Sequence, residues 1–192
     1  MTLWLARHAQ PLVEPGVCYG ALDVAADAQA TQVAAQKLAE ALPSGTSVVS
    51  STLQRCELLT LTLSALRPDL TLIFDPRLRE MDFGRWEGQR WDAIGQRALE
   101  AWTDDFARHR PGGGESVQMF MQRVAAAWDA VGTRPTLWVT HAGVARACSL
   151  LAAGIRSVGR ADQWPHAAPG YGEWLTFEPA TPAQMPPDRP RG

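Results

Sequence analysis

The chain alternates short apolar runs with longer amphipathic stretches. Five runs rich in β-branched, aromatic or leucine residues, each bounded by polar residues, Gly or Pro, predict strands. These strands span residues 2–6, 46–50, 70–74, 136–140 and 173–177. The stretches between them predict helices over residues 26–42, 51–66, 91–108, 115–131 and 143–153. This alternation predicts an α/β fold, a three-layer sandwich in which helices cover both faces of a mainly parallel central sheet.

Local signals refine the starts of two helices. Ser51 and Gln54 have the spacing of a capping box, so we expect Ser51 to begin a helix directly after the second strand. Another helix follows the stretch PGGG, where Glu115 and Ser116 precede an amphipathic segment. Both side chains can reach a substrate from this loop, but the preference of helix starts for such residues favours capping.

Length and composition fit one domain. A chain of 192 residues with 46% hydrophobic side chains can bury a sizeable core, and we assign residues 1–178 to it. Residues 179–192, PATPAQMPPDRPRG, are too rich in proline to form regular structure. We expect them to form a loose C-terminal tail.

Charge and cysteine usage narrow the class of protein. A formal net charge of −2 gives no broad basic field, so we expect neither nucleic acid nor a membrane as a partner. No run approaches the ~20 apolar residues of a membrane span. Cys18, Cys56 and Cys148 are scattered and fit reduced thiols in the core of a cytoplasmic protein.

Several enzyme classes lack their residues in this chain. Lys37 is the only lysine, which argues against Schiff-base chemistry and against P-loops. No Cys-x5-Arg, Asp-x-Asp or G-x-S-x-G motif occurs. The four histidines form no local metal motif, so we expect no metal and no other cofactor.

Three predicted strands lead into similar polar residues. The first ends at Arg7 and His8, another leads into SSTLQR with Arg55, and a third leads into THAGVAR with His141. Parallel strands place their carboxyl ends at one edge of a sheet, so these side chains can meet in one crevice. Guanidinium groups form paired hydrogen bonds with phosphate. We therefore predict a phosphate site.

Each of these residues has a simpler interpretation when it is taken alone. Arg55 in the first turn of a helix opposes the helix dipole, and an ion pair with Glu57 or another carboxylate offsets this as well as a bound anion does. A single histidine is more often a hydrogen-bonded core residue. In the phosphate interpretation, one neutral ring attacks phosphorus while the other contacts the phosphoryl oxygens.

A leaving alkoxide needs a proton, and the segment LREMDFGRWEG offers three carboxyl groups. Glu80 is the preferred donor, with Asp82 and Glu87 as rivals that the spacing does not exclude. A donor near neutral pH needs its pKa raised from ~4.3 by burial or neighbouring charge. The alternative is a surface carboxylate that pairs with one of the arginines in positions 77–85.

Four motifs, in this order, resemble those of the histidine phosphatase superfamily, whose fold is phosphoglycerate mutase-like. RHA at 7–9 is similar to its Arg-His-Gly signature, and SSTLQR at 50–55 to its second-arginine motif. LREMDFGRWEG at 78–88 resembles the acid motif, and VTHAGVAR at 139–146 resembles the second-histidine motif. The resemblance covers nearly the whole domain.

This resemblance implies roles for the residues of the predicted site. His8 becomes transiently phosphorylated in a pocket formed by Arg7, Arg55 and His141. Glu80 protonates the leaving group and then activates the water that cleaves the phosphohistidine. The implied substrate is a small phosphorylated metabolite, and no metal is implied.

Two alanines stand where the family usually has glycine. Ala9 adds a Cβ that clashes if the backbone there needs a positive φ. Ala142 follows the second histidine, and its backbone N–H stays free to face phosphate. Activity is therefore still expected.

Within the superfamily, three stretches look most like the α-ribazole phosphatase branch of cobalamin biosynthesis. These are VCYGALDV at 17–24, MDFGRWEGQRWDAI at 81–94 and PGGGESV at 111–117. The resemblance then places Tyr19 and the amide of Gly20 in a loop that touches the ester, with an ordinary turn as a serious alternative.

The eight tryptophans leave the substrate open. They can line a pocket for an aromatic leaving group, with Trp86 and Trp91 nearest the acid motif. Most tryptophans, however, are packed in the core or half-buried.

Two further functions remain alternatives. One is a phosphohistidine protein phosphatase, because short members of the superfamily act on proteins. The other is a non-catalytic module that binds a phosphorylated ligand, for which Ala9 is the motive. Mutase activity fits less well, since the chain lacks the asparagine-bearing stretch that mutases carry after the first motif.

Overall fold

The computed structural model describes residues 2–178 and contains one central sheet. Its strands lie in the order β3-β2-β4-β1-β5. Neighbours among the first four are parallel, and β5 is antiparallel to β1. The strands are β1 (Leu3–Arg7), β2 (Ser47–Ser50), β3 (Thr71–Phe74), β4 (Thr136–Thr140) and β5 (Trp174–Phe177). The predicted α/β fold with a mainly parallel sheet is confirmed, whereas the predicted tail, 179–192, lies outside the described residues.

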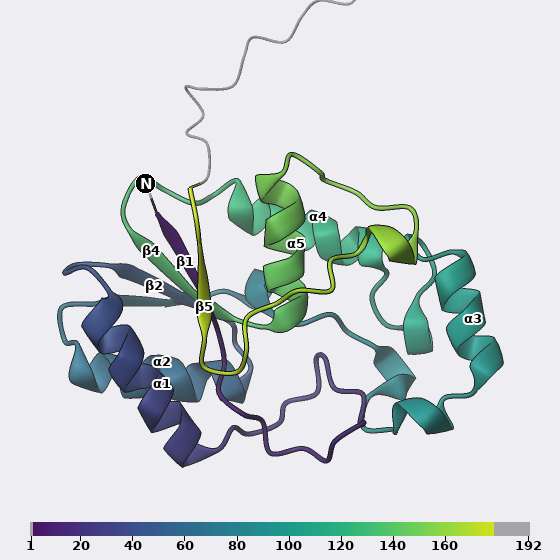
Figure 1. Ribbon diagram of the computed structural model, residues 1–192, viewed down its shortest axis with the longest axis horizontal. Coiled ribbons are helices and arrows are strands. Elements are labelled where there is room, and N and C mark those ends of the chain that lie inside the picture. The colour runs from purple at the N-terminus through teal and green to yellow at the C-terminus, as the bar shows by residue number, and fades with distance from the viewer. Residues whose placement is uncertain (1, 179–192) are drawn as a thin grey trace, which may run out of the picture.

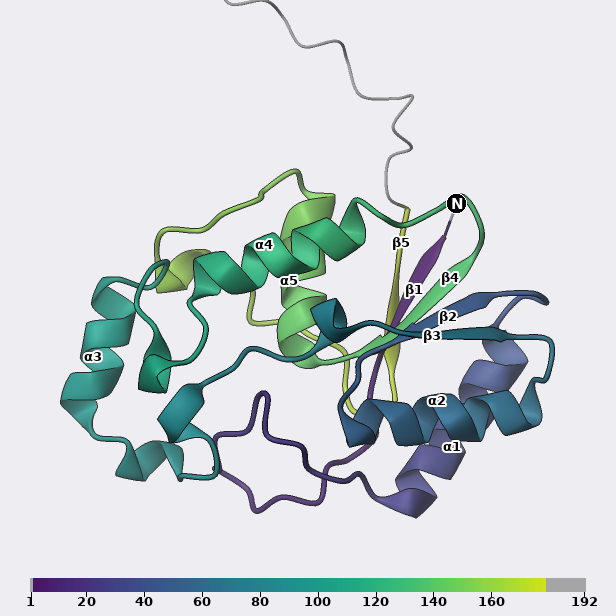
Figure 2. The same ribbon diagram turned by 180° about the vertical axis from the view of Figure 1, so that it is seen from behind.

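Helices cover both faces of this sheet, as Figures 1 and 2 show from opposite sides. One face carries α1 (Ala28–Ala41) and α2 (Gln54–Leu66), and the other carries α4 (Val117–Trp128) and α5 (Ala142–Ala152). The fifth helix, α3 (Gln96–Asp104), lies away from the sheet beside the loops that connect it to the domain. No helix in the described part of the chain is long and apolar enough to cross a membrane.

The alternation of side chains along the strands divides the core into two parts. Leu3 and Leu5 of β1 pack with the apolar faces of α4 and α5, whereas Ala6 packs with α1 and α2. Every residue of β4 is buried because this strand lies between two others and under helices on both faces. The three cysteines are buried free thiols, as predicted.

The topology brings three strand ends together at one edge of the sheet. Since β4 lies between β1 and β2, the residues after all three strands are neighbours. The amide of His8 donates to the carbonyl of Thr140 at 3.0 Å, and the amide of Ser51 donates to that of Val139 at 2.9 Å. These bonds extend the ladders beyond the regular strands and fix the backbone of the predicted site.

The structure corrects two predicted helix boundaries. The capping box at Ser51 is wrong, because α2 begins at Gln54 and its N-cap residue, Leu53, makes no side-chain capping bond. The helix predicted over 91–108 is interrupted by Gly95, whose φ of +90° is incompatible with helical backbone. The predicted cap at Ser116 is confirmed, since its side chain accepts the amide of Met119 at the start of α4.

Candidate active site

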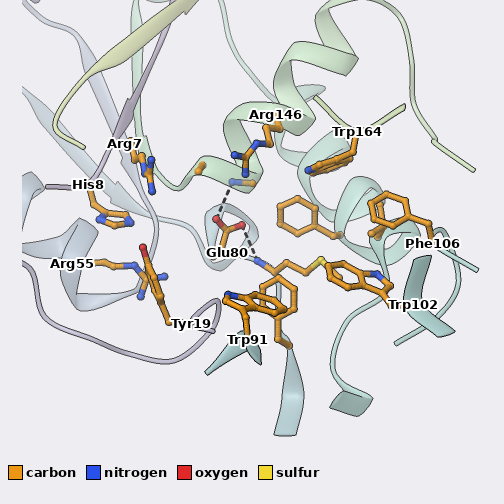
Figure 3. Close-up of a pocket in the computed structure, with 16 residues that line it drawn as sticks. Arg7, His8, Tyr19, Arg55, Glu80, Trp91, Trp102, Phe106, Arg146 and Trp164 are labelled. Atoms are coloured by element: carbon orange, nitrogen blue, oxygen red, sulfur yellow. Dashed lines mark hydrogen bonds between the residues drawn. The ribbon is translucent and has the colours of Figure 1, made fainter. Parts of the chain in front are cut away.

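A cavity of about 430 Å³ opens at the carboxyl ends of the strands (Figure 3). Arg7, His8 and Arg55 lie at one end of it. Aromatic side chains, including Trp91 and Trp102, line the other end. We name one end of the cavity the phosphate end, after the phosphate site predicted for the histidines and arginines that follow the strands, and the other the aromatic end.

His8 is held in one orientation at the phosphate end. Its Nδ1 lies 2.7 Å from the carbonyl oxygen of Ala9, which can only accept, so a neutral ring carries its proton on Nδ1. The lone pair is then on Nε2. No non-glycine residue in the described part of the chain has a positive φ, so Ala9 fits this backbone without strain.

His141 lies opposite His8, with 5.2 Å between the ring centroids. It follows β4 and is the N-cap residue of α5. Its Nε2 lies 2.8 Å from the hydroxyl of Ser51 and 3.5 Å from the sulfur of Cys56. Ser51 therefore orients the second histidine instead of capping a helix.

Both histidines are neutral over the physiological pH range. Burial, followed by the charge of Arg55, lowers the pKa of His8 from 6.5 to about 3. Burial and the same arginine also lower the pKa of His141 well below its ordinary value. A neutral ring keeps the lone pair that a nucleophile needs.

Arg55 is fully buried and binds backbone carbonyls rather than a carboxylate. It donates to Gly20 at 2.6 Å and to Leu22 at 2.8 Å. No ion pair with Glu57 or another carboxylate forms in the described part of the chain, so the ion-pair interpretation of Arg55 is wrong. The loop carbonyls leave its charge uncompensated and available to an anion.

Arg7 and two tyrosines complete the phosphate end. The Arg7 guanidinium lies 3.8 Å from the ring centre of Tyr171 and donates to the carbonyl of Pro169. The hydroxyls of Tyr19 and Tyr171 are 2.7 Å apart, and burial raises the pKa of Tyr19 to about 12. Within the described residues, the buried Nε atoms of Arg7 and Arg55 have no hydrogen-bond partner. Both arginines line the cavity, where their guanidinium groups can bind a phosphoryl group.

The three candidate proton donors occupy different places. Glu80 lines the cavity, and its carboxylate accepts the amides of Gly143 at 2.9 Å and Met81 at 3.0 Å. Asp82 instead caps the amide of Gly84, and Glu87 accepts four amides of the loops around it. Only Glu80 of the three therefore reaches the cavity, and it pairs with no arginine in the described structure.

The loop carrying Tyr19 fits the prediction in part. Tyr19 lines the cavity, but the amide of Gly20 donates to the carboxylate of Glu87 at 2.9 Å. The prediction that this amide touches the ester is therefore wrong. Gly20 is needed for packing, because a Cβ there would lie 1.8 Å from the carbonyl oxygen of Met81.

The start of α5 also borders the cavity. Ala142, the first residue of this helix, lines the wall as expected, and its amide lies at the positive end of the helix dipole. Arg146, one turn later, lines the same wall, although the sequence analysis did not select it. The spacing of four residues from Ala142 is the signal that places it on this face.

The aromatic end contains residues that the sequence analysis named and others that it missed. Of the two tryptophans considered for a pocket wall, Trp91 lines the cavity, whereas Trp86 is buried, with 6.3 Å between their ring centroids. Trp102 stacks on Trp91 at 6.5 Å, and Trp164 faces them from another loop. A helical spacing of four between Trp102 and Phe106 was the available signal for this wall.

Glu115 and Ser116 lie outside this cavity. Ser116 caps α4, and Glu115 forms an ion pair with Arg123 at 2.7 Å. Within residues 2–178, no group of three or more His, Cys, Asp or Glu side chains has the arrangement of a metal site.

Comparison with solved structures gives related phosphatases and related folds. TTHB049 from Thermus thermophilus is 30% identical over 92% of both chains, with a TM-score of 0.70. A mycobacterial glucosyl-3-phosphoglycerate phosphatase is 27% identical over 91% of this chain and 88% of its own, with a TM-score of 0.72. The α-ribazole phosphatase from Shigella flexneri, 24% identical over 93% of this chain and 90% of its own, has a TM-score of 0.79 and shows the fold alone. A comparison with curated protein sequences found no match.

The family is established by a match along almost the whole domain. The model of the histidine phosphatase superfamily, branch 1, matches residues 3–179. This match includes the segments that supply His8, Arg55 and Glu80 to one cavity and that place His141 beside His8. The chain belongs to the histidine phosphatase superfamily and is a phosphatase enzyme.

Proposed function

We propose that the protein hydrolyses the phosphomonoester of a small metabolite through a phosphohistidine at His8. The observation that carries this proposal is the pair of buried histidines, with 5.2 Å between their ring centroids, beside Arg7 and the buried Arg55 at one end of the cavity. A phosphoryl group at this position can contact both arginines and both rings. Glu80 lines the same cavity, where the ester oxygen of the leaving group would lie.

In the first step, the lone pair of His8 Nε2 attacks phosphorus and a P–N bond forms. The bond from phosphorus to the ester oxygen breaks, and protonated Glu80 gives its proton to that oxygen, so the leaving group departs as an alcohol. The N–H groups of Arg7, Arg55 and the start of α5 stabilise the negative charge on the phosphoryl oxygens. Both imidazoles begin neutral, which suits attack by one of them.

In the second step, water attacks the phosphohistidine from the side that the alcohol has left. Glu80, now a carboxylate, takes a proton from this water, and the P–N bond breaks with its electron pair returning to His8. Phosphate leaves, and Glu80 is protonated again for the next cycle. The bond between His8 Nδ1 and the Ala9 carbonyl keeps the same nitrogen facing phosphorus in both steps.

The aromatic end supports a substrate whose alcohol carries a flat aromatic group. Trp91, Trp102 and Trp164 offer ring faces on which such a group stacks. α-Ribazole 5′-phosphate has this composition, because its ribose ester bears a benzimidazole base. Sequence motifs similar to the α-ribazole phosphatase branch favour the same substrate, and we propose it as the first to be tested.

A rapid-quench experiment tests the mechanism. Wild-type protein mixed with 32P-labelled ester should carry label that is stable in alkali and lost in acid, and His8→Ala should carry none. Turnover without labelled protein, or an unchanged rate in His8→Ala, would contradict the nucleophile.

A panel of esters then tests the substrate class. It contains α-ribazole 5′-phosphate, sugar phosphates, phosphoglycerates and a protein bearing phosphohistidine. Because His8 is 2% exposed within the cavity, we expect the small esters to be hydrolysed much faster than the protein. The highest kcat/KM for a sugar phosphate or for the protein would overturn the aromatic assignment.

A further inference from the structure

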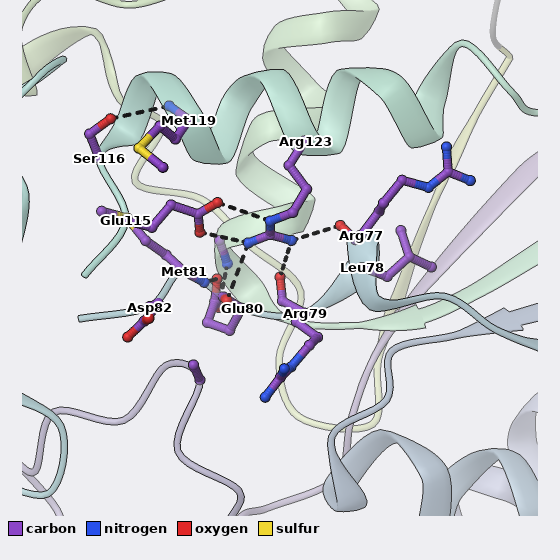
Figure 4. A network of polar contacts seen from close by, with 12 residues as sticks. Arg77, Leu78, Arg79, Glu80, Met81, Asp82, Glu115, Ser116, Met119 and Arg123 are labelled. Atoms are coloured by element: carbon purple, nitrogen blue, oxygen red, sulfur yellow. Dashed lines mark hydrogen bonds and ion pairs between the residues drawn. The ribbon is translucent and has the colours of Figure 1, made fainter. Parts of the chain in front are cut away.

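The backbone segment that carries Glu80 is held by one arginine of a different element. Arg123 on α4 donates from Nη1 to the carbonyls of Arg77 at 2.7 Å and Arg79 at 2.9 Å, and from Nη2 to that of Glu80 at 3.4 Å (Figure 4). Its Nε and Nη2 also form a two-point ion pair with Glu115, at 2.9 and 2.7 Å. All five N–H groups of this guanidinium are therefore used.

Glu115 holds the other side of the same segment. Its backbone amide donates to the carbonyl of Asp82 at 2.7 Å, while its side chain holds the guanidinium of Arg123. The carbonyls on both sides of Glu80 are thus tied to Arg123, in the middle of α4, and to Glu115, just before this helix. The ion pair is largely buried, with exposed fractions of 22% for Arg123 and 12% for Glu115.

We propose that Arg123 and Glu115 are positioning residues for the proton donor. This inference rests on the proposed function, in which Glu80 protonates the leaving oxygen. Neither residue lines the cavity, so both act through the backbone of residues 77–82. The planar guanidinium of Arg123 suits this role, because a lysine in its place has only three donors and can make only some of these five hydrogen bonds.

If Arg123 and Glu115 position Glu80, their loss should affect different esters differently, whereas a contribution to stability alone should not. A displaced proton donor slows esters of poorly acidic alcohols, whose alkoxide must be protonated as it leaves. It hardly slows p-nitrophenyl phosphate, whose phenolate leaves without a proton. Loss of stability alone lowers both rates by the same factor, because it removes active protein.

The chain contains a matched control in Arg67. Its guanidinium likewise pairs with a carboxylate at two points, Asp69 at 2.7 and 2.8 Å, and donates to three backbone carbonyls. It is 18% exposed, close to the value for Arg123. Because it follows α2, Arg67 lies at the opposite edge of the sheet from the cavity.

The experiment measures kcat/KM of the purified full-length chain for p-nitrophenyl phosphate and for a phenylalkyl phosphate. The variants are Arg123→Met, Arg123→Lys, Glu115→Gln and Arg67→Met, with Glu80→Gln as the reference for a lost donor. We expect Glu80→Gln to lower the alkyl rate by ~10²–10⁴ relative to the aryl rate. Arg123→Met should lower the same ratio by roughly 10–100-fold, and the Lys and Gln variants by less. Arg67→Met should leave the ratio unchanged.

The outcomes separate the two proposals. If wild type hydrolyses neither ester and forms no phosphohistidine, the proposed function is wrong and the positioning role falls with it. If wild type and Glu80→Gln behave as expected but all folded Arg123 and Glu115 variants keep the wild-type ratio, only the positioning role is wrong. If Arg123→Met does not fold, the ratio of alkyl to aryl rates in Arg123→Lys and Glu115→Gln tests the positioning role instead. Both variants keep a polar side chain at the ion pair.

Discussion

The two ends of the cavity are built in different ways. At the phosphate end, Arg7 is the last residue of β1, and His8 and His141 directly follow β1 and β4. Hydrogen bonds of the sheet fix the backbones of Arg7 and His8. At the aromatic end, Trp91 lies in a short 3-10 helix and Trp164 in a loop, and neither belongs to the sheet. The position of the first set follows from the topology, whereas that of the second depends on how connecting segments pack.

This difference suggests a division between reaction and substrate choice. Changes at the phosphate end should affect every ester, because every ester has the same phosphoryl group. Changes at the aromatic end should affect only esters large enough to reach it. Glu80 lies between the two ends, and its loss should depend on the acidity of the leaving group (Figure 3).

The largest effect is expected at the phosphate end. His8→Ala removes the proposed nucleophile, so kcat should fall by on the order of 10⁴-fold or more on aryl and alkyl esters alike. Steady-state phosphate release measures this loss. As a control, His166→Ala changes an exposed histidine and should keep the wild-type rate. A loss of rate with only one class of ester would contradict the expectation that the phosphate end acts on every ester.

An intermediate effect is expected for Gly143→Ala. A Cβ at this position would lie 2.1 Å from Glu80 Oε1, so the carboxylate must move. The rate with an alkyl ester should fall roughly 10–100-fold, and the rate with p-nitrophenyl phosphate by much less. Gly132→Ala is the control, because no atom lies within 4 Å of its added Cβ. Equal losses on the two esters would place the damage at the phosphate end instead.

A smaller effect is expected at the aromatic end. Trp102→Ala removes the ring that stacks on Trp91 and should raise KM for an aromatic ester by ~10-fold, while kcat for a short-chain alkyl phosphate stays near wild type. Trp128→Ala, which packs on Phe177 away from the cavity, is the control and should change neither constant. A large fall in kcat for the short ester would show that the two ends are coupled.

The smallest effect concerns stability and pH. The pKa of His8 is about 3 in the folded chain and near 6.5 when unfolded, so between these values the unfolded state binds the extra proton. The free energy of unfolding should therefore fall as pH falls below 6.5, by up to about 1.4 kcal/mol per pH unit from this residue. The free energy of unfolding, measured with urea at several pH values between 7 and 5, should depend less steeply on pH in His8→Asn than in wild type. The same pH dependence in both proteins would contradict a neutral, buried imidazole at His8.

Much of the fold could be predicted because strands and helices have different periods of burial. The five strands and the helices of the two outer layers occur near their predicted positions, with their bounds shifted by at most three residues. The helix predicted over 91–108 was less accurate, since Gly95 takes a backbone conformation that local hydrophobicity does not encode. Ser51 satisfied a local capping pattern, but its hydroxyl instead contacts a residue 90 positions away.

The site was predictable where the topology determines it. His8, Arg55 and His141 follow the carboxyl ends of parallel strands, which predicted one shared edge, and the structure shows that these strands are adjacent. The choice among the three carboxyls was not predictable, because it depends on which loop amides each one accepts. Glu87 binds the amides of Gly20, Ala21, Leu22 and Phe83, and only the folded loops show this.

The last strand has a consequence for synthesis of the chain on the ribosome. Gly172 donates its amide to the carbonyls of Arg7 and His8, and Tyr171 covers the Arg7 guanidinium. Until these residues emerge, β1 lacks its antiparallel neighbour and leaves a strand edge open to other chains. His8 is therefore translated before the rest of the domain but reaches its final surroundings only after residues 171–177 have been made.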